Sequence, residues 1–224
     1  MDHTLALIHT SPVLVPLFDG LCRQHLPGIR VFHMVDESLI KNTIAAGALR
    51  KTTVRRLAAQ VGSAFDAGAT AVFVTCSSIG PGVAVARQLY DGPIFRVDEA
   101  MAAKAVATGP RIGVLATLNT TLDPTVQILR DTASALGIKC EVTSSCCDGA
   151  FEAMLAGNTG KHDRMVSAEL IRLASSVDVF VLAQASMARV LASLPAGQPP
   201  VPVLTSPELA VLQIRDSLTG APAA

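Results

Sequence analysis

The sequence predicts an α/β fold of two similar lobes, each with a parallel four-stranded sheet, related by pseudo-two-fold symmetry with the active site in the cleft between them. Three observations support this prediction. Short apolar stretches rich in β-branched residues alternate with helical stretches, which is typical of parallel sheets. The order of elements then repeats, since Thr10 and Thr117, and likewise Val72 and Val179, lie 107 residues apart. Polar side chains also collect at the ends of predicted strands, where open α/β sheets bind ligands.

The first lobe is predicted to span residues 1–108. Its strands are expected at 4–8, 30–35, 71–74 and 93–97, because each is a short apolar run between polar residues. Helices are expected at about 12–25, 49–67, 82–90 and 98–109. Pro12 suits the first turn of its helix, and Gly68 suits the left-handed residue that closes the long one. The polar stretch that ends at Gly47 is assigned to no element.

The second lobe is predicted to span residues 109–205. Strands are expected at 111–116, 139–143, 178–182 and 201–205. One helix is expected to open at Asp123-Pro124 and run to about residue 136. After the strand at 139–143 and its polar end, helical sequence is expected to run to about residue 175 with a break at 157–160. A terminal helix at about 206–219 is predicted to cross back to the first lobe. The tail at residues 220–224 is expected to be frayed.

Composition narrows the classes of partner. The 224 residues are half hydrophobic and their formal charges sum to zero, with no dense Lys/Arg cluster, which argues against nucleic acid and anionic membranes as partners. No stretch is long and apolar enough to span a bilayer, and the start of the chain lacks the basic region of a signal peptide, so a cytoplasmic protein is expected. Apolar helices with little charge suggest a homo-oligomer.

The five cysteines are expected to be reduced thiols. They show no CxxC or Cys/His spacing, so neither a disulfide framework nor a metal site is predicted, and no cofactor is expected. Cys146 and Cys147 are expected to be packing residues or an adventitious pair, and Cys22 and Cys140 are expected to be core or surface residues. Cys76 differs, because it follows a buried strand directly and precedes Ser77, Ser78 and a glycine-containing turn.

Two interpretations of Cys76 stay open on local sequence alone. Backbone N–H groups and the helix dipole at such a strand end favour a thiolate and can also hold a carboxylate. Alternatively, Cys76 is one more small buried apolar residue, as free cysteine often is.

The predicted strand ends share a small neutral set of hydroxyls and amides. Such groups suit a carboxylate without any arginine, so the expected ligand is a small organic acid. The set comprises His9, Thr10, Ser11, Cys76, Ser77 and Ser78 from the first lobe and Thr117, Asn119, Thr120, Thr121, Gln184 and Ser186 from the second.

Several motifs together resemble a known family. They are the segments 72–78, 97–101 and 112–117, the pairs 120–121 and 124–125, and the segment 181–187. In this order they resemble the aspartate/glutamate racemase superfamily, which includes hydantoin racemases, maleate isomerases and arylmalonate decarboxylases. The resemblance implies two cysteines, one from each half, that move a proton at the carbon next to a carboxylate without pyridoxal phosphate or metal. It also implies that Cys76 is the first-half cysteine.

The sequence departs from this pattern at the second cysteine. The family motif places that position at Gln184, whereas the ungapped internal repeat pairs Cys76 with Ala183, and neither residue is a thiol. Gln184 can donate hydrogen bonds to a carboxylate but cannot shuttle a proton at neutral pH. His9 is the candidate for a second acid or base, and its alternative is a hydrogen-bonded structural histidine.

The predicted function is therefore a cofactor-independent isomerase or racemase that acts through Cys76 at the carbon alpha to a carboxylate. Two alternatives stay open. One is a lyase like arylmalonate decarboxylase, in which a single thiol protonates the carbanion left by loss of carbon dioxide. The other is a carboxylate-binding protein without turnover.

Overall fold

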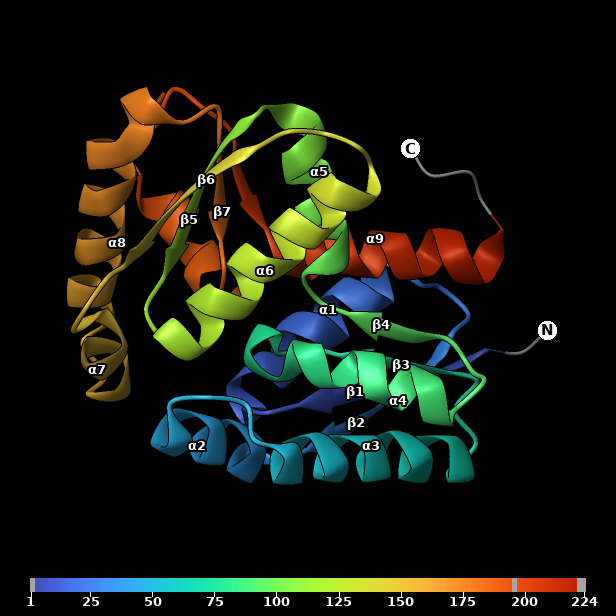
Figure 1. Cartoon of the computed structure of the whole chain (residues 1–224). Coiled ribbons are helices and arrows are strands. Elements are labelled where there is room, and N and C mark those ends of the chain that lie inside the picture. The colour runs from blue at the N-terminus through green and yellow to red at the C-terminus, as the bar shows by residue number, and fades with distance from the viewer. Residues whose placement is uncertain (1–2, 195–196, 221–224) are drawn as a thin grey trace. The chain divides into compact units, whose positions relative to one another are not determined.

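The structure, a computed structural model, describes residues 3–194 and 197–220. The chain divides into two compact units, Met1–Glu99 with Pro207–Ala224, and Ala100–Ser206. Within the described residues each unit has one four-stranded parallel sheet, in the order β2-β1-β3-β4 in the first and β6-β5-β7-β8 in the second (Figure 1). The predicted α/β class with two parallel four-stranded sheets is thereby confirmed. The predicted frayed tail lies, beyond Gly220, outside the described residues.

The helices of the first unit come from the first half of the chain, except for one that comes from its end. Its strands are β1 (Thr4–His9), β2 (Arg30–Val35), β3 (Ala71–Val74) and β4 (Ile94–Arg96). Its helices are α1 (Val15–His25), α2 (Glu37–Ala46), α3 (Lys51–Asp66), α4 (Val83–Leu89) and α9 (Ser206–Thr219), with the 3-10 turns η1 (Pro12–Leu14) and η2 (Ser77–Gly82).

Helix α2 corrects the sequence prediction, which left this polar stretch without an element. The Asp36 side chain accepts a hydrogen bond from the Ser38 N–H at 3.0 Å and so caps the helix, and Gly47 closes it with a φ of 64°. Only Leu39 and Thr43 are buried on α2. The apolar periodicity was therefore too weak to indicate a helix.

The second unit repeats this order of elements. Its strands are β5 (Arg111–Ala116), β6 (Glu141–Cys146), β7 (Val179–Leu182) and β8 (Val203–Thr205). Its helices are α5 (Glu99–Thr108), α6 (Asn119–Ala135), α7 (Ala150–Leu155) and α8 (Thr159–Leu173), with the 3-10 turns η3 (Ala174–Ser176) and η4 (Ala185–Ser193). No helix among the described residues is both long and apolar enough to cross a membrane.

Several bounds in the second unit differ from the prediction, and two of the differences have a clear local cause. Helix α6 begins at Asn119, not at Asp123-Pro124, because the N–H groups of Thr121 and Leu122 already bond the Leu118 carbonyl, and Pro124 lies inside the helix. Strand β6 runs on to Cys146, because its polar residues pair with β5 as readily as apolar ones would.

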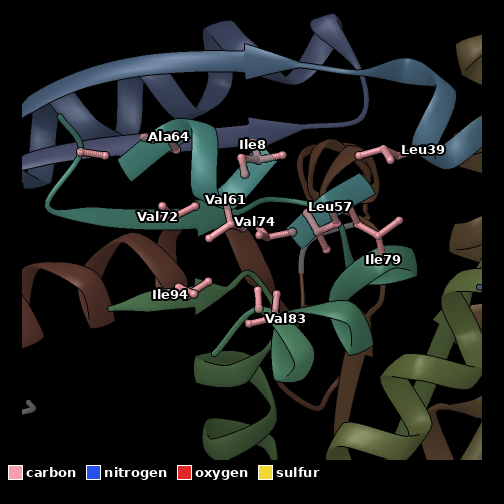
Figure 2. Packing of buried hydrophobic residues seen from close by; sticks show 13 residues of the cluster. Ile8, Leu39, Leu57, Val61, Ala64, Val72, Val74, Ile79, Val83 and Ile94 are labelled. Carbon is pink, nitrogen blue, oxygen red and sulfur yellow. The ribbon is translucent and has the colours of Figure 1, made fainter. Parts of the chain in front are cut away.

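The core of the first unit reaches the turn η2. Side chains of β1, β3, α3 and α4 meet on one face of the sheet, and Ile79 of η2 packs among them with no exposed surface (Figure 2). A Cβ on Gly82 would lie 3.0 Å from the Leu57 side chain, so the turn also packs closely against α3. The backbone around Ile79 is therefore held by the core, which matters for the residue before the turn, Cys76.

Candidate active site

Cys76 lies two residues beyond β3 and directly before η2. Its backbone is extended (φ −128°, ψ 117°), which makes it the N-cap of the turn. Hydrogen bonds from the Thr10 side chain, from the backbone N–H and side chain of Ser78, and from the backbone N–H of Ile79 reach the sulfur. The predicted grouping of Thr10, Cys76 and Ser78 is thus present in the first unit.

Two opposing effects act on the Cys76 thiol. Its hydrogen bonds lower the pKa because they stabilise the thiolate, whereas burial raises it, and burial is the larger effect, so the net pKa lies above the ordinary thiol value. The residue nevertheless keeps part of its surface exposed. The resting group is therefore a protonated thiol that remains within reach of a small molecule.

Thr10 and Ser11 follow β1, Ser77 follows Cys76 directly, and the three differ in burial. Thr10 and Ser77 are each 5% exposed, while Ser11 is half-buried and precedes η1 without a side-chain capping bond. Of these three side chains, only Thr10 contributes a hydrogen bond to the sulfur.

The His9 side chain belongs to a row of hydrogen-bonded side chains within the first unit. One ring nitrogen lies 2.9 Å from the Thr75 hydroxyl and the other lies 2.9 Å from Nδ1 of His33. His33 in turn lies 3.9 Å from the Asp19 carboxylate. Burial, with a smaller contribution from the charge of His33, lowers the pKa of His9 to about 4. Both ring nitrogens of His9 are thus engaged by side chains of the first unit, which favours the structural interpretation, and its role as a second acid or base stays a prediction.

Strand register shows which residue of the second unit corresponds to Cys76. Ile8 of β1 pairs with Val74, and Cys76 lies two residues further on; Leu115 of β5 pairs with Leu182, and Gln184 lies two residues further on. Gln184 is also the extended N-cap of the following 3-10 turn (φ −118°, ψ 134°). The equivalent of Cys76 is therefore Gln184, as the family motif indicates, and the ungapped repeat fails by one residue at this strand.

The Gln184 side chain is oriented by Thr117. Its Oε1 accepts hydrogen bonds from the Thr117 backbone N–H at 2.6 Å and from the Thr117 hydroxyl at 2.9 Å. A backbone N–H can only donate, so the amide atom that it contacts must be the oxygen. The amide nitrogen, with its two donor hydrogens, therefore points away from Thr117.

The start of α6 supplies three of the other predicted residues of the second unit, and the turn after Gln184 supplies the fourth. Among the described residues, the Thr120 hydroxyl oxygen is buried without a hydrogen-bond partner, which is uncommon for a polar group. Thr121 is 3% exposed and also buried. Asn119 is exposed, and Ser186 is half-buried in the turn after Gln184.

Cys146 and Cys147 lie at the end of β6, an edge strand that is separated from β7 by β5. Burial is the main reason that the pKa of Cys146 rises to about 11 and that of Cys147 to about 12. They are thus both less acidic than a free thiol and one strand removed from Gln184. Among the described residues no group of three or more His, Cys, Asp or Glu side chains could hold a metal ion.

The sequence indicated backbone donors at this strand end, but it did not indicate that Ile79 supplies one of them or which residues support the site. The N–H of Ile79 has no signature in a side-chain pattern, because any residue could supply it. His33 and Thr75, which engage His9, looked like ordinary strand residues. Gly80 was the one signal available in the sequence, since a glycine in a turn indicates either a left-handed backbone or a close approach of another group.

The chain resembles known proteins both in sequence and in fold. Residues 9–214 match the model of the Asp/Glu/hydantoin racemase family. No curated protein matches the sequence. Among solved structures, the glutamate racemase of Bacillus anthracis is similar with a TM-score of 0.75 at 16% identity, covering 98% of this chain and 83% of that one. The allantoin racemase of Klebsiella pneumoniae has a TM-score of 0.69 at 19% identity, covering 100% and 90%. The aspartate racemase of Picrophilus torridus has a TM-score of 0.71 at 12% identity, covering 98% and 95%.

Proposed function

Because the chain belongs to the Asp/Glu/hydantoin racemase family, we propose that it is a cofactor-independent isomerase that moves a proton at the carbon alpha to a carboxylate, with Cys76 as its reacting thiol. One observation carries the proposal. The Cys76 sulfur stands at the end of β3 with hydrogen bonds from Thr10, Ser78 and Ile79, while the equivalent position in the second unit holds an amide. The substrate class is a small organic acid.

The proposed step is a reversible proton transfer. Cys76 first loses its proton to solvent, and the thiolate then takes the α-proton of the substrate. The electron pair of the broken C–H bond moves into the carboxylate and forms an enediolate, which hydrogen-bond donors stabilise.

A single thiol has a stereochemical consequence. The proton that Cys76 takes from one face mostly returns to that same face, because the proposal places no acid at the position of Gln184. Inversion occurs only when water gives a proton to the opposite face of the carbanion, and Cys76 then returns its own proton to solvent. The hydrogen at the α-carbon therefore exchanges with solvent faster than the configuration inverts. Since burial keeps the pKa of Cys76 above its ordinary value, the exchange rate should also keep rising through neutral pH as the thiolate fraction grows.

The protonated state of Cys76 favours one alternative, a decarboxylating lyase. A disubstituted malonate would lose one carboxylate as carbon dioxide, and the electron pair of that bond would stay on the remaining carbon as an enediolate. The Cys76 thiol would then give its proton to this carbon and regain one from water. Such a reaction needs the thiol form, which burial favours at neutral pH.

The test is proton NMR in deuterium oxide with the wild type and Cys76→Ser. The panel comprises aspartate, glutamate, hydantoins, maleate and aryl malonates. Loss of the α-proton signal with the wild type and not with the variant is the expected result. Release of carbon dioxide would replace the isomerase by the lyase. Ligand shifts without turnover, unchanged in Cys76→Ser, would leave a carboxylate-binding protein instead.

A further inference from the structure

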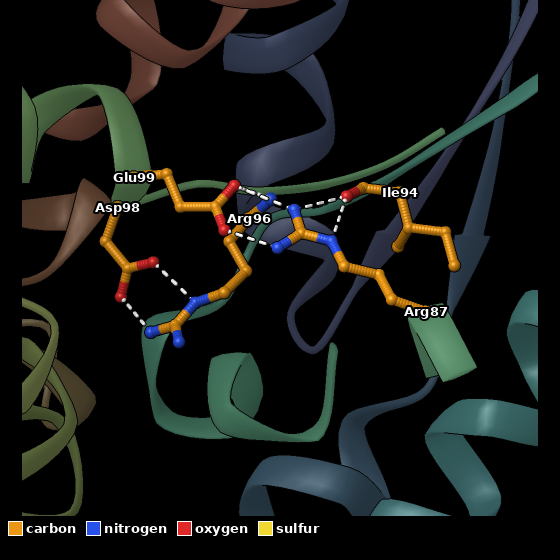
Figure 3. Close-up of polar contacts among 5 residues, drawn as sticks. All are labelled: Arg87, Ile94, Arg96, Asp98 and Glu99. Atoms are coloured by element: carbon orange, nitrogen blue, oxygen red, sulfur yellow. Dashed lines mark hydrogen bonds and ion pairs between the residues drawn. The ribbon is translucent and has the colours of Figure 1, made fainter. Parts of the chain in front are cut away.

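A buried ion pair lies beside the turn that follows Cys76. Arg96 is the last residue of β4, and Asp98, two residues later, has no exposed surface. Arg96 Nε donates to Asp98 Oδ1 at 2.9 Å and Nη2 donates to Oδ2 at 2.8 Å (Figure 3). Two parallel bonds of this kind fix the plane of a guanidinium group, which a single contact does not.

The guanidinium of Arg96 lies directly against Gly80 of η2. A Cβ on Gly80 would lie 2.7 Å from Nε, 2.8 Å from Nη2 and 2.9 Å from Cζ of Arg96. Gly80 is not among the glycines with a positive φ. The turn has a glycine at this position because the Arg96 guanidinium occupies the volume that a side chain on residue 80 would need.

Gly80 directly follows the groups that serve the thiol. Ser78 and Ile79 donate their backbone N–H groups to the Cys76 sulfur, and the Ile79 side chain is fixed in the core. The core therefore holds η2 through Ile79, and Arg96 holds it through Gly80.

We propose that Arg96, held in plane by Asp98, is a positioning residue that keeps η2 in the conformation in which the N–H groups of Ser78 and Ile79 point at the Cys76 sulfur. The catalytic importance of this role rests on the proposed function of Cys76. Its effect on the thiol does not, because the reactivity of Cys76 can be measured without any substrate.

A second arginine in the same region provides a matched control. Arg87 donates to both oxygens of Glu99, at 2.7 and 2.9 Å, and to the Ile94 carbonyl (Figure 3). It thus also forms a bidentate pair with a carboxylate and supports β4. The Arg87 side chain is 42% exposed, however, and it contacts the start of β4 rather than η2.

The test follows alkylation of Cys76 by iodoacetamide as a function of pH, with the Cys76 peptide quantified by mass spectrometry. Loss of N–H donors to the thiolate raises the thiol pKa. Arg96→Met should therefore slow Cys76 alkylation about tenfold at a given pH and move its midpoint about one unit higher. Arg87→Met should keep the wild-type profile. An unchanged profile in folded Arg96→Met would overturn the proposal.

A double-mutant cycle separates positioning from general damage. Gly80→Ala should slow the alkylation of Cys76 in the wild-type background but not in an Arg96→Ala background, because the atoms that its methyl group would meet are then gone. Equal slowing in both backgrounds would contradict the role of Arg96. If Arg96→Met does not fold, Arg96→Lys replaces it. This variant keeps the charge but loses the planar guanidinium, so the midpoint of the pH profile of Cys76 alkylation should still rise. An unchanged midpoint would again overturn the proposal.

Discussion

At the residue scale, Cys76 shows what a sequence can and cannot indicate. A thiol after a buried strand, followed by two hydroxyls and a glycine turn, was enough to single it out. The net effect on its pKa could not be predicted, because burial and three hydrogen-bonding residues act in opposite directions. That balance depends on the packed structure and decides whether the resting group is a base or an acid.

Gln184 shows a second limit. The internal repeat keeps a spacing of 107 residues at the first strand of each unit, but the strand that ends before Gln184 is shifted by one residue. Only the pairing of β5 with β7 shows this shift, because β-strand register is set by contacts between strands rather than by spacing along the chain. The family motif was the better guide because it is anchored on the strand end itself.

His9 provides a pH-dependent prediction. Its folded pKa of about 4 lies below the ordinary 6.5, so the unfolded chain binds a proton more readily between those values. This contribution to stability is complete above pH 6.5 and is lost as the pH falls toward 4, by at most about 3 kcal/mol.

The measurement is urea unfolding of the wild type and His9→Gln from pH 7 to pH 4. The free energy of unfolding of the wild type should fall more steeply than that of the variant, since other titrating groups are common to both. Parallel curves would show that His9 is not held neutral by the fold.

At the element scale, α2 is a helix that apolar periodicity alone does not predict. Its start is stabilised by Asp36, which also accepts hydrogen bonds from Arg56 and Gln60 at 2.7 Å each. The sequence does contain the signal, an aspartate before a serine and a glycine at the far end, but no apolar stripe draws attention to it.

Replacement of Asp36 tests this helix start. Asp36→Ala removes the cap and the partner of Arg56 and Gln60, so the free energy of unfolding should fall by about 1 to 3 kcal/mol. Glu37→Ala is the matched control, because Glu37 is exposed and pairs only with Lys41 at 3.5 Å among the described residues, and it should cost less than about 0.5 kcal/mol. Equal losses in urea unfolding would show that the cap does not stabilise α2.

At the scale of the whole molecule, the fold class was predictable because alternation of strands and helices is a pattern of many residues and tolerates local errors. The Arg96–Asp98 ion pair, which supports the turn η2, was not predictable from the sequence, because two charged residues near a strand end look like surface residues. Their burial depends on which loop packs over them, and here Gly80 makes the room.

The expected homo-oligomer stays a prediction. Large apolar side chains are exposed on the single chain, including Val13 at 80%, Leu155 at 70% and Leu89 at 61%. Sedimentation equilibrium should give a mass of at least twice the chain mass of 23.2 kDa, since contacts between copies would remove such side chains from water. A mass of one chain at all concentrations would contradict the prediction.

The central claim is that Cys76 works without a thiol at the position of Gln184. The most direct test compares two rates in deuterium oxide, exchange of the α-hydrogen and inversion of configuration, for a substrate that the wild type turns over. Exchange should be the faster by at least about tenfold in the wild type, and Gln184→Cys should bring the two rates together. Equal rates in the wild type would show that a second acid already acts on the opposite face of the substrate and would contradict the account.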